Sequence, residues 1–436
     1  MLFGNIRHNP NALFGTCCLA YIANGLMGVL PSSSLALLAH NTHVSLSTAG
    51  LTFTGSAFGT ILAVILSTCY LVKATNSKLV IILGLAGLIA TSLIIPITSS
   101  FTLWFIAQIL QGVSGTFISV GLVMTLTFNF GDRLSEKLNM LHSSAGVGSL
   151  FGPVLLSFTL SLTHSLLTAF TVVTLVSLIC LLTLYTLHFV SKAPTTQSTE
   201  ASDHQPHKAR VNPMHLIKNA LFWFMALQIC LYVGAESGFS NWLVTSISQS
   251  ASIALPMATP AATLFWVGIT LGRFIVAQLI KRGYVTGVRL LYVCIAGGCL
   301  SGLLVTAFLC NPPICFIGSL LEGIFIGPIY PSLQSIATRR FSRTPALISC
   351  LVLVSTGLAG MTIPFSMGML IPLLGTRGSM VIPALLCLCV AIPFALANKS
   401  ERHILIHRRS NIHIEPVSTP VQDLPTRELP NLQALA

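Results

Sequence analysis

Long apolar stretches follow one another along almost the whole chain. A helix that crosses a bilayer needs about 20 mainly apolar residues, and stretches of that length recur between short polar segments. Only 7% of the 436 residues are charged and 53% are hydrophobic, whereas soluble domains carry roughly 25% charged residues. The sequence therefore predicts an all-α integral membrane protein. Twelve spans are expected, at residues 13–36, 48–71, 79–97, 102–126, 141–161, 166–190, 219–246, 261–280, 287–307, 314–336, 345–371 and 379–397.

Two polar segments interrupt this pattern. Residues 191–215 are rich in Pro, Ser, Thr and charged side chains, a composition that does not support a packed core. The residues beyond position 398 have a similar character. We therefore expect an N-terminal six-helix bundle at 1–190, a cytoplasmic linker at 191–215, a C-terminal six-helix bundle at 216–398 and a disordered cytoplasmic tail at 399–436.

Basic residues are distributed unevenly between the predicted loops. Cytoplasmic loops of membrane proteins are enriched in Lys and Arg. With the amino terminus inside, all but one of the 22 basic residues fall on the cytoplasmic side, Arg273 among them, and only Arg377 falls outside. This alternation predicts a multi-pass protein of the inner (plasma) membrane with both termini in the cytoplasm. The charges lie in short loops without interleaved aromatic residues, which argues against a nucleic-acid partner.

The two halves of the chain repeat one another. A shift of 211 residues pairs Tyr21 with Tyr232 and Gln111 with Glu322, in two different predicted helices. Six-helix repeats related by an axis along the membrane normal are a known transporter architecture, in which the substrate binds near the midplane between the repeats. The duplication therefore favours a transporter with a central cavity.

Four stretches of the sequence resemble a known family. They are LNMLHSSAGVGSLFGP (138–153), YVGAESGFSNW (232–242), GITLGRFIVAQLIKRG (268–283) and GPIYPSLQSIA (327–337). Together they resemble the major facilitator superfamily, and within it the fucose-permease-like sugar transporters. The resemblance implies two six-helix bundles that alternate access to a site lined by helices one, four, seven and ten.

The chain also departs from that branch. Its proton-coupled members carry acids in helices one and four, whereas the corresponding polar positions here include Asn24 and Gln111. Proton coupling at the usual positions is therefore left open. The resemblance further implies a gating role for Gly272 and Arg273, because the basic motif of the family helps to close the inward face; a solvated arginine is the alternative.

Only two of the ten acids, Glu236 and Glu322, fall within predicted spans. A carboxylate inside a bilayer is costly unless it pairs, faces a cavity or takes up a proton. Both glutamates are therefore candidate substrate ligands and proton carriers. The alternative for each is a structural hydrogen bond to a neighbouring helix.

Sugars are held by an aromatic face together with several amide, hydroxyl or carboxylate groups. Each aromatic candidate has packing or a position in an interfacial belt as its alternative. The residues of these kinds that complete the candidate substrate site with the two acids are Asn24, Gln108, Gln111, Gln228, Asn241, Trp242, Trp266 and Tyr330.

These observations predict a secondary transporter for a small polar solute such as a sugar or sugar-like metabolite. No phosphate-binding G-x-x-x-x-G-K-[ST] motif occurs, so the drive would be an ion gradient, protons being one option, or the solute gradient alone. An exporter of drugs or amphiphilic metabolites and a transport-inactive membrane receptor are the alternatives. An enzyme is not expected, because no nucleophile cluster, acid pair or metal-ligand set is present, and neither a metal nor a cofactor is expected.

The expected partners are the solute, protons and the lipid bilayer, and the protein is expected to be a monomer.

Cys310 and Cys315 flank a predicted external turn. Whether they form a disulfide is left open.

Overall fold

The computed structural model describes residues 10–67, 76–130, 133–191, 219–282, 287–341 and 345–396. The predicted linker and tail lie outside the described residues, except for Ser191. The described residues form helices and no strands. The helices are α1 (Pro10–Ser33), α2 (Leu35–Asn41), α3 (Leu46–Ala49), α4 (Leu51–Leu66), α6 (Ser77–Ile94), α7 (Phe101–Phe130), α8 (Leu134–Thr163), α9 (Leu166–Thr186), α11 (Ala220–Ser250), α12 (Leu255–Ala258), α13 (Pro260–Lys281), α14 (Gly287–Ala307), α15 (Pro312–Ile326), α16 (Ile329–Arg340) and α17 (Pro345–Cys389).

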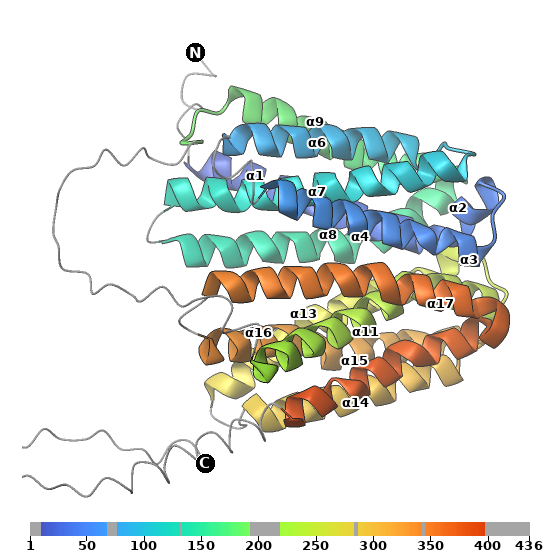
Figure 1. Ribbon diagram of the computed structural model, residues 1–436. Helices are drawn as coiled ribbons and strands as arrows, with labels where there is room; N and C mark the ends of the chain where they lie inside the picture. Colours follow the sequence, from blue (N-terminus) through green and yellow to red (C-terminus); the bar gives the residue numbers. More distant parts are fainter. Residues whose placement is uncertain are drawn as a thin grey trace, which may run out of the picture.

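The number of membrane spans depends on one residue of α17. Within the described ranges, 11 helical segments are long and apolar enough to cross a membrane, and the last of them, Val354–Leu396, has 43 residues. Gly375 lies inside it with non-helical φ and ψ of 69° and 174°, a backbone conformation that glycine adopts without steric cost. Figure 1 shows that α17 reverses its direction at the end of the molecule where α3 lies. The segment thus supplies two spans, and the prediction of twelve is confirmed.

The two halves of the chain lie on two sides of the molecule. In Figure 1, α1 to α9 occupy the upper part and α11 to α17 the lower part. Within the first half, α1 packs on α8 and α7 packs on both α4 and α6; within the second half, α11 packs on α17 and α13 packs on α15. The halves meet where α4 contacts α17 and α8 contacts α13. Polar groups near this seam can therefore come from either repeat.

Glycines bring α13 and α15 into backbone contact. A side chain at Gly272 would collide with the carbonyl of Ile324, and one at Gly323 would collide with the carbonyl of Phe265. Small residues at such crossings allow close helix packing in membranes. Gly272 therefore sets the separation of the two helices, and this close contact places the next residue, Arg273, beside the end of α15.

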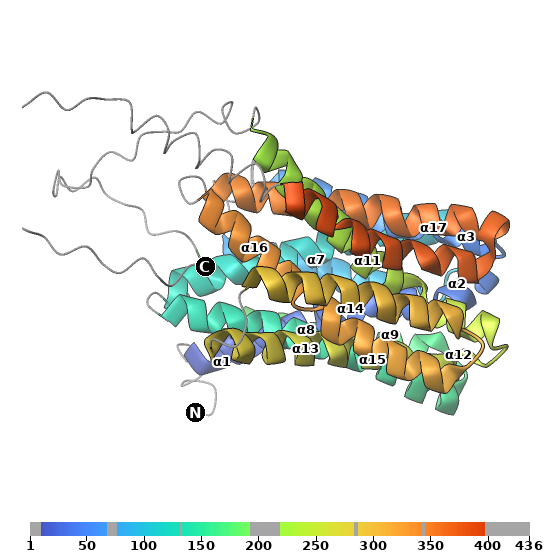
Figure 2. The same cartoon turned by 90° about the horizontal axis from the view of Figure 1, so that it is seen from below.

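Hydrogen bonds join the halves towards one end of the molecule. The Ser157 hydroxyl of α8 donates to the carbonyl of Pro256 in α12 at 2.8 Å, and the Thr54 hydroxyl of α4 donates to the carbonyl of Met361 in α17 at 3.0 Å. The short helices α2, α3 and α12 lie at this end, opposite to α16 (Figures 1 and 2). The two halves are thus held together by specific hydrogen bonds at the end where α2, α3 and α12 lie.

Cys310 and Cys315 are both free thiols in the structure. The Cys315 thiol is buried and donates to the carbonyl of Phe308 at 3.2 Å, while Cys310 is exposed. The turn between α14 and α15 therefore presents one accessible cysteine.

Candidate substrate site

Two adjoining cavities lie between the halves. The larger, termed the main cavity, has a volume of about 360 Å³, and the smaller, termed the adjoining cavity, of about 270 Å³. Volumes of this order are at the lower end of those found for small-molecule sites. The two cavities share residues of α1, α11 and α17, so they are parts of one central space. The shared residues are Gly28, Ser32, Val233, Ser237, Asn241 and Thr356.

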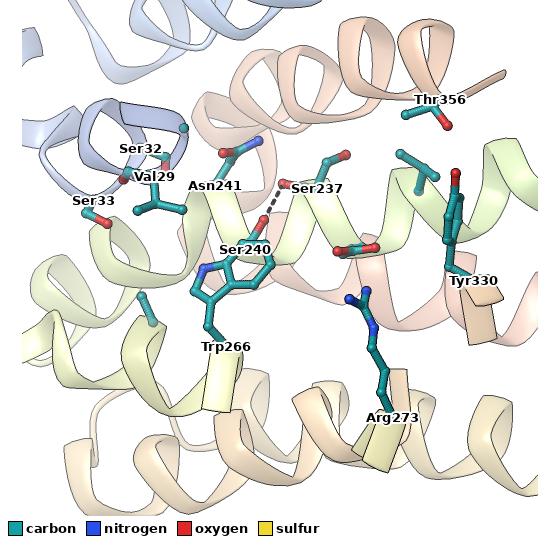
Figure 3. A pocket seen from close by; sticks show the side chains of 14 residues that line it. Val29, Ser32, Ser33, Ser237, Ser240, Asn241, Trp266, Arg273, Tyr330 and Thr356 are labelled. Carbon is teal, nitrogen blue, oxygen red and sulfur yellow. Dashed lines mark hydrogen bonds between the residues drawn. The ribbon is translucent and has the colours of Figure 1, made fainter. Parts of the chain in front are cut away.

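Helix α11 supplies one polar wall of the main cavity. Glu236, Ser237, Ser240 and Asn241 all line it, because residues three or four positions apart lie on one face of a helix. The Ser240 hydroxyl donates to the carbonyl of Ser237 at 3.4 Å (Figure 3). Among the described lining residues Glu236 is the only acid. The wall therefore combines one carboxyl group with small neutral hydrogen-bonding groups.

Helix α13 supplies an aromatic group and a cation to the same cavity. Trp266 and Arg273 both line it, since seven residues amount to two helical turns. The guanidinium points into the cavity from below in Figure 3. Its Nε donates to the carbonyl of Gly327, between α15 and α16, at 3.1 Å.

The position of Arg273 corrects the charge count made from the sequence. That count assigns Arg273 to the cytoplasmic side, but the residue lies within the span Leu255–Ile280 and reaches the cavity. A cation is tolerated there because it faces a polar cavity rather than lipid. The contact with Gly327 is within the second half, so the gating role of Gly272 and Arg273 stays a prediction.

Two tyrosines extend this wall. The rings of Tyr232 in α11 and Tyr330 in α16 are 5.9 Å apart and inclined by 36°. Tyr330 lines the main cavity, whereas Tyr232 is fully buried behind it. Glu236 and Arg273 line the same cavity as Tyr330. The acid, the cation and the tyrosine pair thus lie together in the second half.

The first half lines the central space with neutral groups. Ser32 and Ser33 of α1 face the main cavity, and Gln108 and Gln111 of α7 face the adjoining cavity. The Gln111 amide nitrogen donates to the carbonyl of Met27 at 2.9 Å. Gln108 is 2% exposed, and its amide oxygen has no hydrogen-bond partner in the described structure. The Gln111 amide thus turns its oxygen away from Met27, while the Gln108 oxygen is buried and unpaired in the described structure.

Trp242 lies away from both cavities. It is 1% exposed, its indole N–H donates to the carbonyl of Pro364 at 2.8 Å, and its ring packs edge-on against Phe53 of α4 at 6.0 Å. A local unwinding at Gly234 and Gly238 would be needed to turn it inward, but α11 is continuous there and both glycines pack against α17. Asn241 therefore lines both cavities, whereas the adjacent Trp242 is directed towards Pro364 and Phe53.

Glu322 and Asn24 also lie outside the lining of the cavities. Glu322 is 1% exposed and accepts a hydrogen bond from the Ser301 hydroxyl of α14 at 2.6 Å. Asn24 lies one turn before Gly28 in α1, and its side chain lies against Gly115 of α7. Gln228 is buried, and its amide atoms have no partner in the described structure. The structure therefore brings together Gln108, Gln111, Glu236, Asn241, Trp266, Arg273 and Tyr330, and leaves Asn24, Gln228, Trp242 and Glu322 apart from them.

Several lining residues were not singled out as ligands from the sequence. Ser237 lies next to Glu236 and one turn before Asn241, so helical spacing from a polar neighbour is a signal for it. Ser32 lies one turn after Gly28, which lines the same cavity. Thr356 has no such signal, because its place depends on how α17 packs against α11.

Comparison with known proteins identifies the family. Residues 17–349 match the family model described as Major Facilitator Superfamily. The chain belongs to this superfamily. It is accordingly a multi-pass membrane transporter and not an enzyme.

The similarities to individual proteins are more distant. The glucose/mannose transporter GlcP of Bacillus subtilis is 26% identical over 152 residues, which is 35% of this chain and 36% of that protein. The matches to curated relatives span little more than a third of the length of each. A bacterial homologue of the human lysosomal transporter Spinster, solved inward-facing and unoccupied, superposes with a TM-score of 0.70 at 13% identity, covering 90% of this chain and 98% of that one. A mutant of the nucleoside transporter NupG gives 0.68 at 13% identity, covering 88% and 99%. These structures establish the fold of this superfamily member.

Proposed function

We propose that the protein moves a small polyhydroxylated solute, a sugar or sugar-like metabolite, by alternating access around the central space. The observation that carries the proposal is the lining between the two halves: hydroxyl and amide groups on both sides, with the Trp266 and Tyr330 rings beside them. A sugar offers an apolar ring face and a rim of hydroxyl groups, which this combination matches. The similarity to a glucose/mannose transporter supports the same solute class.

We assign proton coupling to Glu236. It is the one acid among the described cavity residues and shares its surroundings with the cation Arg273. When the cavity closes and water leaves, an ionised carboxylate must be paired or protonated, so solute occupancy and proton uptake become linked at this residue. Glu322 is sealed within the second half and bonded to Ser301, and we assign it a structural role.

Uptake into proteoliposomes tests the proposal. The full-length protein would be given labelled D-glucose, D-mannose, L-fucose and a cationic amphiphile, with and without an inward proton gradient. Saturable uptake of a sugar, stimulated by the gradient, is expected. Movement of the amphiphile alone would favour an exporter. Saturable binding of a sugar without flux would favour the receptor alternative, and either result would contradict the proposal.

We also propose that both termini face the cytoplasm of the inner membrane and that the monomer is the transporting unit. Arg377 and the exposed Cys310 lie at turns of the second half opposite α16, and the guanidinium of Arg377 donates to the carbonyl of Ala307 at 2.8 Å. A membrane-impermeant maleimide should therefore label Cys310 in intact cells. Labelling that persists in Cys310→Ser, or that appears only after the cells are opened, would contradict this orientation.

A further inference from the structure

Two helices beside the central space each contain a proline four residues after a carbonyl group that receives a side-chain hydrogen bond. In an α-helix the N–H of one residue donates to the carbonyl four residues earlier, and proline has no N–H. Pro31 therefore leaves the carbonyl of Met27 without its helical donor in α1, and Pro331 of α16 does the same for Gly327, which lies between α15 and α16 with helical φ and ψ of −53° and −43°. A carbonyl away from water needs a replacement donor.

Gln111 is the replacement donor in the first half. Its amide nitrogen lies 2.9 Å from the Met27 carbonyl oxygen. A carbonyl oxygen only accepts hydrogen bonds, so the amide nitrogen must face it. The amide oxygen is then left as the free group of a side chain that lines the adjoining cavity. Pro31 thus makes Gln111 an acceptor rather than a donor towards a solute.

Arg273 is the replacement donor in the second half. Its Nε lies 3.1 Å from the Gly327 carbonyl oxygen. The guanidinium is planar and carries only donors, so this bond fixes its plane and leaves the terminal N–H₂ groups for the main cavity, into which the side chain points in Figure 3. Pro331 thus holds Arg273 as a pre-set donor towards a solute.

We infer that these two proline-freed carbonyls set the hydrogen-bond polarity of the substrate site. The first half presents an acceptor through Gln111, and the second half presents a forked donor through Arg273. The solute therefore places a hydroxyl group towards α7 and an oxygen acceptor towards α13, as a sugar or other polyol can. A cationic group is disfavoured beside the guanidinium, because like charges repel. Pro31 and Pro331 are positioning residues, and Gln111 and Arg273 contact the solute.

A thermal double-mutant cycle tests the positioning without requiring transport. In detergent-purified full-length protein, Gln111→Leu should lower the melting temperature by about 2–4 °C, the effect expected for one hydrogen bond. In the Pro31→Ala background the new N–H can serve the Met27 carbonyl, so the same substitution should have little effect. In the same way, Arg273→Met should lower the melting temperature in the wild-type background but have little effect in the Pro331→Ala background. The matched control is Pro372→Ala, an exposed proline inside α17, in which Gln111→Leu keeps its full effect.

The two cycles are independent, so a misfolded variant in one half leaves the other to decide. Equal effects of Gln111→Leu in the wild-type, Pro31→Ala and Pro372→Ala backgrounds, with the same result for the Arg273 pair, would overturn the inference.

Transport provides a second measurement, which rests on the proposed function. With the monosaccharide that the wild-type protein takes up best, Pro31→Ala should raise KM at least threefold while kcat stays within twofold, because the Gln111 amide is intact but no longer held. Gln111→Leu should also reduce discrimination between that sugar and its deoxy analogues. Unchanged KM and discrimination would contradict the inference. If no sugar is transported at all, the proposed function fails, while the thermal cycles still decide the positioning.

Discussion

The two halves of this transporter line one central space with different chemistry. The described residues of the first half contribute neutral groups, such as Ser32, Gln108 and Gln111, whereas the second half contributes Glu236 and Arg273. The sequence offset that pairs Gln111 with Glu322 matches an amide in the first half to an acid in the second. The difference teaches that a repeated fold does not require repeated chemistry: the first half can supply hydrogen bonds while the second supplies charge. The predictions below test this division of roles.

The largest effect is expected at Glu236. A gradient of one pH unit supports about tenfold solute accumulation when one proton moves with each solute, and Glu236→Gln should abolish that accumulation while solute exchange across the membrane persists. Uptake of labelled sugar by proteoliposomes measures both. Glu322→Gln is the matched control, since it changes the same group at a site sealed from the cavity, and it should still accumulate sugar. Loss of accumulation in Glu322→Gln alone would reverse the assignment.

Arg273 should give the next largest effect. Hydrogen bonds from charged groups contribute about 1.5–3 kcal/mol, so Arg273→Met should lower kcat/KM for the best sugar about 10- to 100-fold. Arg273→Lys should recover little of this, because one ammonium group cannot serve both the Gly327 carbonyl and a solute in the geometry of the guanidinium. Initial uptake rates over a range of sugar concentrations measure these values. Full activity of Arg273→Met would contradict the claim that the second half binds the solute through the charge of Arg273.

A smaller effect is expected from the neutral wall. Gln108→Leu removes an amide whose oxygen has no partner in the described structure. We expect kcat/KM to fall about fivefold, the value of one neutral hydrogen bond, while the melting temperature is unchanged or higher because no buried acceptor is left unsatisfied. A fall as large as that of Arg273→Met would contradict the distinction between the halves. Transport kinetics and a thermal melt of the same preparation decide it.

Trp242 should show the smallest effect on transport. Trp242→Phe removes the hydrogen bond to Pro364 and should lower the melting temperature by about 2–4 °C, with kcat/KM for sugar within twofold of wild type. Its neighbour Asn241 lines both cavities, and Asn241→Leu provides the contrast, with impaired uptake. A specific loss of sugar affinity in Trp242→Phe would instead place the indole in the site.

The sequence predicts the membrane fold well because its signal is local. Apolar length gives the spans, and the scarcity of acids in the spans directs attention to Glu236 and Glu322 without any knowledge of tertiary structure. The division of the final 43-residue span is also readable, since Gly375 lies in a short polar interruption of the apolar pattern.

The remainder of the site depends on packing that sequence spacing does not fix. Asn241 and Trp242 are adjacent, and the chemistry of each side chain suits a sugar ligand. Only the contact of α11 with α17 decides which one faces the cavity. The sequence places Arg273 inside a span but assigns it to the cytoplasmic side, and its approach to the cavity follows from the Gly272–Ile324 contact that sets α13 against α15. Thr356 is recruited from a helix more than 100 residues away from Glu236 in the chain, and its position follows from the same packing.

The most direct test of the central claim is a high-resolution structure of the full-length protein with its transported sugar bound. The account predicts density for the sugar between the halves, with a sugar hydroxyl on the Gln111 amide oxygen and a sugar oxygen on the Arg273 guanidinium, beside Glu236. A sugar bound elsewhere, or one that contacts only a single half of the molecule, would contradict it.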